Sequence, residues 1–317
     1  MAVVYFYYPK EVDWSDLKLD LASGLDCWIL QTYLKLKNHN NEFVIRLTSE
    51  IPERGIIVFH KGYFPKLLKP TSKQLFVCVQ ADYGRHKYAQ LHIVQNPLGK
   101  ARLNFSRRAY FERFVFGFSK SYFIPHWNQP GIICRDENRS PELRNVYYFG
   151  AIQNLPAALR NTSFSSQLQQ MDIEFHIVTN PLQWHNYSNS DCVLSIRDFD
   201  QKEHYHKPFS KIINSILAGV PVISGYESSV AYLNRQYQLQ LPVAGTSKEL
   251  EKFIIKLKND YVKELENVKW MKKRITPFCD DAILQDWVLL LGKLDQLLRQ
   301  WQGTNKIKRK FFFLVRS

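Results

Sequence analysis

Short apolar runs that alternate with helical stretches limit the folds that this sequence can adopt. Runs of this length that are separated by helices predict parallel sheets covered by helices on both faces. A chain of 317 residues has room for two such domains, at about 150 residues per domain. The predicted strands are Val3–Tyr8, Gly55–His60, Leu75–Gln80, His92–Gln95 and Tyr122–Pro125, followed by Asn145–Phe149, Ile173–Thr179, Cys192–Ile196 and Pro221–Ser224.

Helices are expected between these runs and at the end of the sequence. The second half should close with two long helices, and Thr246 and Glu249 have the spacing of a capping box at the start of the first. A segment rich in prolines and charges at 128–143 predicts a linker between domains at 1–127 and 144–279. The predicted helices are Leu25–Lys37, Ser106–Phe116, Ser247–Ile275 and Asp281–Gln302.

The charge balance indicates an anionic partner. Forty-three Lys and Arg against 29 Asp and Glu give a formal charge of +14, which suits nucleic acid, acidic lipid or a phosphorylated substrate. No run reaches the roughly 18 apolar residues of a membrane-spanning helix, and the first residues lack the pattern of a secretory signal. We therefore expect a soluble cytoplasmic protein.

The stretch His204–Leu233 carries the most chemical information. Apolar residues recur there at helical spacing from Phe209 onward, and Pro208 suits the first helical position with Lys207 as the N-cap. Lys207 and Lys211 then share one side of the first turn, with Ser210 beside them. Because a helix N-terminus disfavours cations, two lysines there indicate a bound anion that accepts the unpaired N–H groups. Two solvated lysines are the alternative.

The ends of the last predicted strands bring further polar residues toward this turn. Ligands of parallel sheets bind at the carboxyl ends of the strands, so Arg197, Lys207, Lys211, Glu227 and Ser228 should converge on one rim. The cations can neutralise a diphosphate, and a glutamate can accept hydrogen bonds from ribose hydroxyls. Ser228 can cap a following helix. Together these residues predict a nucleotide-diphosphate site.

This half of the chain resembles the donor domain of GT-B glycosyltransferases. The resemblance rests on Lys207-Pro208-x-x-Lys211, on the run Ala218–Ile223 (AGVPVI), and on Glu227-Ser228-Ser229 downstream. It implies two tandem Rossmann-like domains facing a cleft, with 1–127 on the acceptor side and 144–279 binding the donor. It also implies that a helix at 280–303 crosses back onto the first domain.

The resemblance implies transfer of a hexosyl-type sugar from a nucleotide-sugar to an acceptor hydroxyl, in the synthesis of a glycan, envelope polysaccharide or glycolipid. It implies neither a cofactor nor a metal, and we expect no carboxylates clustered like Mg²⁺ ligands. Many retaining members of this class carry two glutamates where this chain has His206 and Asn214. Retention and inversion therefore both stay open.

Two residues of the first half are candidates for the general base that activates the acceptor hydroxyl. His60 and Asp82 each follow a predicted strand, and both residue types serve as bases. The alternatives are structural: Asp82 caps a turn or pairs with Arg85, and His60 makes a structural hydrogen bond. The sequence contains neither of the glycine-rich phosphate signatures of dinucleotide-binding and Walker-type sites.

Two other uses of the positive charge are possible. A nucleic-acid- or polyanion-binding α/β protein without catalysis is the main rival, but the basic residues are scattered and no nucleic-acid-binding motif is present. The tail at 304–317 mixes cations with aromatics in Lys306–Leu314, which suits docking on the anionic inner face of a membrane. A disordered tail is the alternative there.

Overall fold

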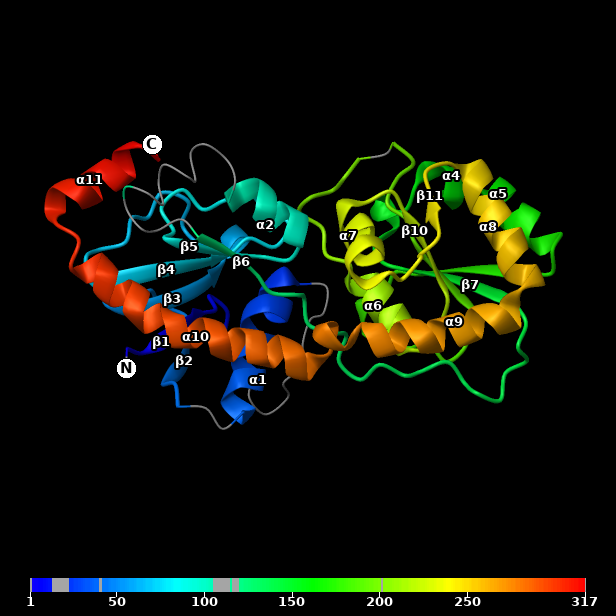
Figure 1. The fold of residues 1–317 in the computed structure, drawn as a ribbon, viewed down its shortest axis with the longest axis horizontal. Coiled ribbons are helices and arrows are strands. Elements are labelled where there is room, and N and C mark those ends of the chain that lie inside the picture. The colour runs from blue at the N-terminus through cyan, green and yellow to red at the C-terminus, as the bar shows by residue number, and fades with distance from the viewer. Residues whose placement is uncertain are drawn as a thin grey trace. The chain divides into compact units, whose positions relative to one another are not determined.

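The computed structural model describes residues 2–12, 23–39, 42–104, 115, 120–200 and 202–316. The helix expected at Ser106–Phe116 lies outside these residues except for Val115. The chain forms two units, each with its own sheet (Figure 1). The first comprises Met1–Trp127, His206–Pro208 and Asp280–Ser317, and the second comprises Asn128–Tyr205 and Phe209–Cys279.

The sheet of the first unit has six parallel strands in the order β2-β1-β3-β4-β5-β6. Its central strands β3 and β4 are buried on both faces, which is why their sequences are continuous apolar runs. Strand β2 was not predicted, because it lies at the sheet edge and alternates polar with apolar residues. The strands are β1 (Val4–Tyr7), β2 (Ile45–Thr48), β3 (Gly55–His60), β4 (Gln74–Val79), β5 (Leu91–Val94) and β6 (Lys120–Phe123).

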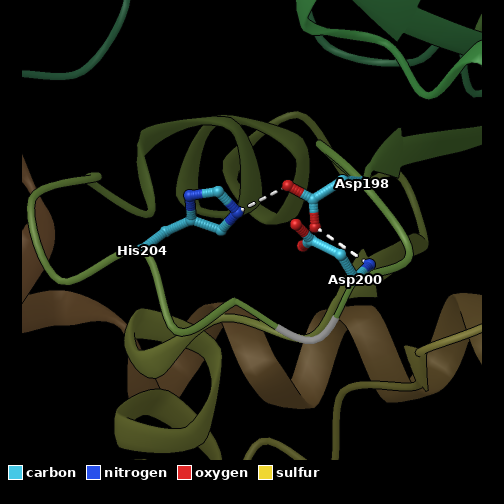
Figure 2. Close-up of side chains that lie close together, drawn as sticks. All are labelled: Asp198, Asp200 and His204. Carbon is cyan, nitrogen blue, oxygen red and sulfur yellow. Dashed lines mark hydrogen bonds and ion pairs between the residues drawn. The ribbon is translucent and has the colours of Figure 1, made fainter.

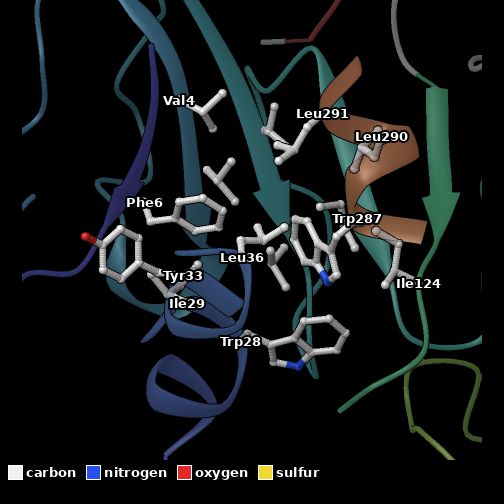
Figure 3. Close-up of a cluster of buried hydrophobic side chains, with 14 of the residues drawn as sticks. Val4, Phe6, Trp28, Ile29, Tyr33, Leu36, Ile124, Trp287, Leu290 and Leu291 are labelled. Atoms are coloured by element: carbon white, nitrogen blue, oxygen red, sulfur yellow. The ribbon is translucent and has the colours of Figure 1, made fainter. Parts of the chain in front are cut away.

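Helices cover one face of this sheet, and aromatic side chains pack between the helices and the strands. A helix that runs through a π-turn at Asp26–Leu30 into α1 (Gln31–Asn38) lies there together with α10 (Asp280–Gln302). Trp28 and Trp287 are fully buried with Phe6 of β1, whose ring lies 6.2 Å from that of Trp287 (Figure 3). A separate cluster around Phe59 and Phe76 fills the opposite face. The unit also contains α2 (Pro97–Asn104) and α11 (Lys306–Leu314).

The second unit has five parallel strands in the order β11-β10-β9-β7-β8. Its two-residue edge strand β11 is too short to give a sequence signal, and it was not predicted. The strands are β7 (Asn145–Phe149), β8 (Glu174–Val178), β9 (Cys192–Ser195), β10 (Val222–Gly225) and β11 (Val243–Ala244). The helices are α4 (Ala157–Arg160), α5 (Thr162–Gln169), α6 (Ser210–Leu217), α7 (Ser228–Tyr237), α8 (Ser247–Asn259) and α9 (Tyr261–Arg274).

The long helix predicted at Ser247–Ile275 is two helices. Asp260 adopts φ −110° and ψ 23° between α8 and α9, and aspartate is a weak helix former that tolerates such a break. The predicted capping signal is confirmed, since the Glu249 N–H donates to Thr246 Oγ1 over 3.2 Å. Among the helices that the structure describes, none is long and apolar enough to cross a bilayer.

The segment expected as a linker at 128–143 belongs to the second unit. Its Arg135 and Arg139 each place a guanidinium nitrogen 3.0 Å from the buried carboxylate of Asp191. That carboxylate also accepts the backbone N–H groups of Arg144 and Asn145 over 3.1 and 2.9 Å. The charged run that indicated a linker therefore anchors the segment beside β7 and β9.

Candidate functional site

The strand order of each sheet locates the edge at which a ligand would bind. Both orders reverse direction after their first strand, between β1 and β3 in the first unit and between β7 and β9 in the second. Open parallel sheets bind ligands outside the carboxyl ends of the strands at such a reversal. A cavity of about 360 Å³ lined by Pro221 and Val222 lies instead at the amino end of β10, so we do not assign the ligand to it.

A glycine turn and a lysine meet at the carboxyl end of β7. Gly150 has φ +153°, and a Cβ built on it would lie 2.8 Å from Lys211 Nζ and 3.0 Å from Tyr148 Oη. The Lys211 ammonium, from the first turn of α6, lies 4.2 Å from the centre of the Tyr148 ring. Burial raises the pKa of Tyr148 to about 12, so its hydroxyl stays neutral. Gly150 and Tyr148 were not predicted as site residues, although a glycine directly after a buried strand was the available signal.

Arg197 and Glu227 lie together beyond β9 and β10. Arg197 Nε is 3.0 Å from Glu227 Oε1, and the glutamate side chain is only 5% exposed. The Ser229 hydroxyl donates to Glu227 Oε2 over 3.4 Å. Ser228 is the first residue of α7 and not its N-cap, which is Glu227, and the Ser228 N–H donates to the Glu203 carbonyl over 2.8 Å. The predicted capping role of Ser228 is therefore wrong.

The predicted position of Lys207 at a helix N-cap is also wrong. Helix α6 begins at Ser210 with Phe209 as its N-cap, and Lys207 precedes it. The reason is that side-chain amides of the first unit hold the backbone before the helix. Gln95 Nε2 donates to the His206 carbonyl over 2.7 Å, and Asn96 Nδ2 donates to the Lys207 carbonyl over 3.2 Å. Lys211 and Ser210 keep their predicted places in the first turn.

The loop after Arg197 brings two carboxylates and an imidazole together, contrary to the expectation of no clustered carboxylates. Figure 2 shows Asp198, Asp200 and His204, whose ligand atoms lie within 4.8 Å of one another. His204 Nε2 is 2.9 Å from Asp198 Oδ2, and Lys202 forms an ion pair with Asp200. The expectation of no Asp-x-Asp triplet and no clustered carboxylates was wrong, since the sequence contains Asp198-Phe199-Asp200. Because these groups satisfy one another, the cluster does not itself indicate a metal.

In the first unit, His60 lies at the carboxyl end of β3 and is 2% exposed. The Gly62 N–H donates to its Nδ1 over 3.2 Å, so the neutral ring carries its proton on Nε2. Nε2 has no hydrogen-bond partner in the described structure, and a Cβ at Gly24 would lie 2.9 Å from it. Burial lowers the pKa of His60 to about 4, against the opposing charge of Asp82. His60 is therefore a buried neutral ring at physiological pH.

Asp82 follows β4 and forms an ion pair with Lys207. Its Oδ2 lies 2.7 Å from Lys207 Nζ, and its Oδ1 accepts a hydrogen bond from Gln95 Nε2 over 3.0 Å. The carboxylate is about half exposed, in contrast to His60. Lys207, which was predicted to bind phosphate, thus pairs with Asp82, one of the two candidate general bases, within the first unit.

The Gly150 turn provides the first test. Replacing Gly150 with alanine should destabilise the second unit by about 1–3 kcal/mol, because a residue with a Cβ is strained at this φ; the new Cβ would also displace the flexible end of the Lys211 side chain. Urea-induced unfolding measures this cost. Gly131→Ala is the matched control, since Gly131 has φ +67° but open space around its Cβ position. A cost for Gly150→Ala no larger than that for Gly131→Ala would contradict the strain assigned to the Gly150 turn.

Comparison with known proteins gives similarity at the level of structure. No protein-family model matches the chain, and no curated protein matches it in sequence. The structure of Anabaena Alr3699/HepE in complex with UDP and glucose covers 92% of this chain and 100% of that chain, with a TM-score of 0.55 and 11% identity. The same protein in complex with UDP-glucose gives a TM-score of 0.51, at 11% identity over 92% of this chain and 99% of that chain.

A second protein extends this similarity. The S. aureus TarM G117R mutant, in complex with fondaparinux, alpha-GlcNAc-glycerol and UDP, aligns with 76% of this chain at a TM-score of 0.52 and 12% identity. The alignment spans only 56% of the TarM chain. Both proteins are GT-B glycosyltransferases, and this chain has the same two-domain α/β fold. The predicted fold class is confirmed.

Proposed function

We propose that this protein is a glycosyltransferase that moves a sugar from a nucleotide-sugar donor to an acceptor hydroxyl. The observation that carries the proposal is the arrangement at the carboxyl end of β7, where Lys211 and the start of α6 meet the Gly150 turn. A basic side chain, a helix N-terminus and a close-approaching backbone together suit a diphosphate. The UDP and UDP-glucose bound to Anabaena HepE support this choice of ligand class.

In this proposal, Lys211 and Ser210 contact the diphosphate. The acceptor oxygen attacks the anomeric carbon while the bond from that carbon to the diphosphate oxygen breaks. Negative charge then grows on the departing diphosphate, where Lys211 and the partial positive charge of the α6 N-terminus stabilise it. These groups supply the charge stabilisation without a metal, and the proposed reaction is metal-independent.

Glu227 and Arg197 are proposed to hold the nucleoside part of the donor. Arg197 and Ser229 contact the Glu227 carboxylate and fix it at the start of α7. Its remaining lone pairs accept hydrogen bonds from the ribose hydroxyls. Ser229 is therefore a positioning residue. The part proposed for Ser228 is smaller, because its backbone N–H is already bonded to Glu203.

Of the two candidates for the general base, Asp82 is the better one. Its carboxylate is half exposed and can accept the proton of the acceptor hydroxyl, while Lys207 and Gln95 fix its orientation. His60 already carries its proton on Nε2 and has a lowered pKa, so it is a weak base. We assign His60 a structural role: its ring packs against Gly24 and accepts the Gly62 N–H at the end of β3. A hexosyl donor and a glycan or lipid-linked acceptor in the cytoplasm complete the proposal.

A ligand panel tests the proposal. The Tm of the purified protein is measured with UDP, GDP, CMP and ADP and with their sugar conjugates. Because ligand binding stabilises the folded state, UDP and UDP-glucose should raise Tm more than the nucleotides that carry other bases. Release of UDP from UDP-glucose in the presence of candidate acceptors then measures turnover. Stabilisation by single-stranded oligonucleotides with no selective response to any nucleotide would instead establish the polyanion-binding alternative.

The buried histidine makes a prediction about pH. Unfolded His60 takes up a proton near pH 6.5, whereas the folded protein resists protonation until about pH 4. The contribution of His60 to stability is therefore constant above pH 6.5 and falls as the pH drops toward 4, by at most about 3 kcal/mol. The lowered pKa values of His86, His92 and His126 act in the same direction. His60→Asn should show a shallower loss of unfolding free energy between pH 6.5 and 4, and an unchanged slope would contradict this assignment.

A further inference from the structure

The C-terminal helix α11 is fixed to the first unit by its inward face. Phe312 is fully buried, and its ring lies 5.3 Å from that of Trp301, the last tryptophan of α10. The Phe313 ring lies 5.5 Å from that of Tyr88. Beyond the helix, Arg316 donates to the Ala89 carbonyl over 2.6 Å. The tail is therefore an ordered helix, which holds its outward face in one orientation.

That outward face carries a second apolar stripe. Ile307, Phe311 and Leu314 are spaced i, i+4 and i+7, so they lie on one side of the helix, and they are 80%, 41% and 68% exposed. Phe312 points to the other side. The Phe312 side of the helix packs on its own unit, whereas Ile307 and Leu314 on the opposite side keep most of their surface exposed. We call Ile307, Phe311 and Leu314 the outer stripe.

Lysines border the outer stripe on both sides. Lys310 and Lys306 lie along one flank at helical spacing and Lys308 along the other, and all three are exposed. No described carboxylate forms an ion pair with them, and Asp295 is the last acidic residue of the sequence. The exposed loop residue Lys69 adds a further positive charge beside α11, since its Nζ lies 5.5 Å from the centre of the Phe313 ring on that helix.

We propose that the outer stripe docks the first unit on an anionic phospholipid bilayer. The three apolar side chains enter the boundary between headgroups and acyl chains, and the flanking lysines extend their stems toward lipid phosphates. An ordered helix with apolar residues at its centre and cations on both edges matches a flat surface that is apolar inside and anionic outside. Three apolar residues give weak, reversible binding that depends on lipid charge. The inference goes beyond the proposed transfer reaction and does not require it.

Co-sedimentation with vesicles tests the inference on the full chain. The protein should sediment with phosphatidylcholine vesicles that contain phosphatidylglycerol and remain in solution with phosphatidylcholine alone. The triple variant Ile307→Ser, Phe311→Ser, Leu314→Ser should lose about tenfold in the partition coefficient. Replacing Lys306, Lys308 and Lys310 with glutamine should lose a similar factor and remove the dependence on salt. Leu289→Ser is the matched control, because Leu289 is 61% exposed on α10 of the same unit, and it should bind as the unaltered protein does.

Two readouts keep the result interpretable. All variants should remain folded, with a cooperative thermal transition, and keep their response to UDP, since the substituted side chains are exposed on α11 or α10 apart from the partly covered Phe311. Failure of the UDP response with intact vesicle binding would overturn the proposed function alone. Equal sedimentation of the triple serine variant and the unaltered protein would overturn the docking surface, as would retention on polyglutamate without any binding to vesicles.

Discussion

Lys211→Ala should lower kcat/KM for sugar transfer by about 100- to 1,000-fold, which is the usual cost of removing one group that stabilises charge in the transition state. The ammonium lies over the Tyr148 ring at the end of β7, and no other lysine of the described second unit occupies the first turn of α6. The loss should appear mainly in kcat if Lys211 meets charge that grows on the departing diphosphate. Steady-state release of UDP from UDP-glucose measures both parameters.

Two companion variants separate charge from structure. Lys263→Ala removes an exposed lysine on α9 of the same unit and should leave turnover unchanged. Lys211→Arg retains the charge and should recover part of the loss. Full activity of Lys211→Ala, with an unchanged rise in Tm on adding UDP, would remove this lysine from the proposed mechanism.

The buried parts of the fold could be predicted from the sequence because burial leaves a clear pattern. Gly55–His60 and Asn145–Phe149 match β3 and β7 residue for residue. Edge strands leave less trace, since β2 alternates polar and apolar residues and β11 has only two residues. Local patterns therefore find the centre of each sheet and miss its margins.

The site was predictable in part for a related reason. Arg197, Lys211 and Glu227 lie at strand ends or helix starts, and strand order alone brings such positions to one edge of a sheet. Lys207 was misplaced because distant side chains, Gln95 and Asn96, determine its backbone conformation. No spacing within the His204–Leu233 segment contains that information.

The same limit explains the segment at 128–143, which composition identified as a linker and which a buried carboxylate fixes to the second unit. Asp191→Ala should destabilise the second unit by about 3–5 kcal/mol, because it leaves the buried Arg135 guanidinium and two partly buried backbone N–H groups without their partner. Urea-induced unfolding should show this as a lower midpoint. Asp191→Asn keeps the shape of the side chain and two acceptor lone pairs but removes the charge, so its cost should be smaller.

A surface ion pair on the same segment provides the contrast. Glu142 Oε2 lies 2.8 Å from Arg144 Nη2, close to the separation in the buried pairs, but both side chains are more than half exposed. Glu142→Ala should therefore cost less than about 1 kcal/mol, because water screens the pair and solvates whichever partner remains. Glu142→Ala removes one exposed ion pair, whereas Asp191→Ala removes two arginine ion pairs and two backbone hydrogen bonds around a buried carboxylate. If they cost the same, then the buried carboxylate does not anchor the segment, and its arginines find other partners when Asp191 is removed.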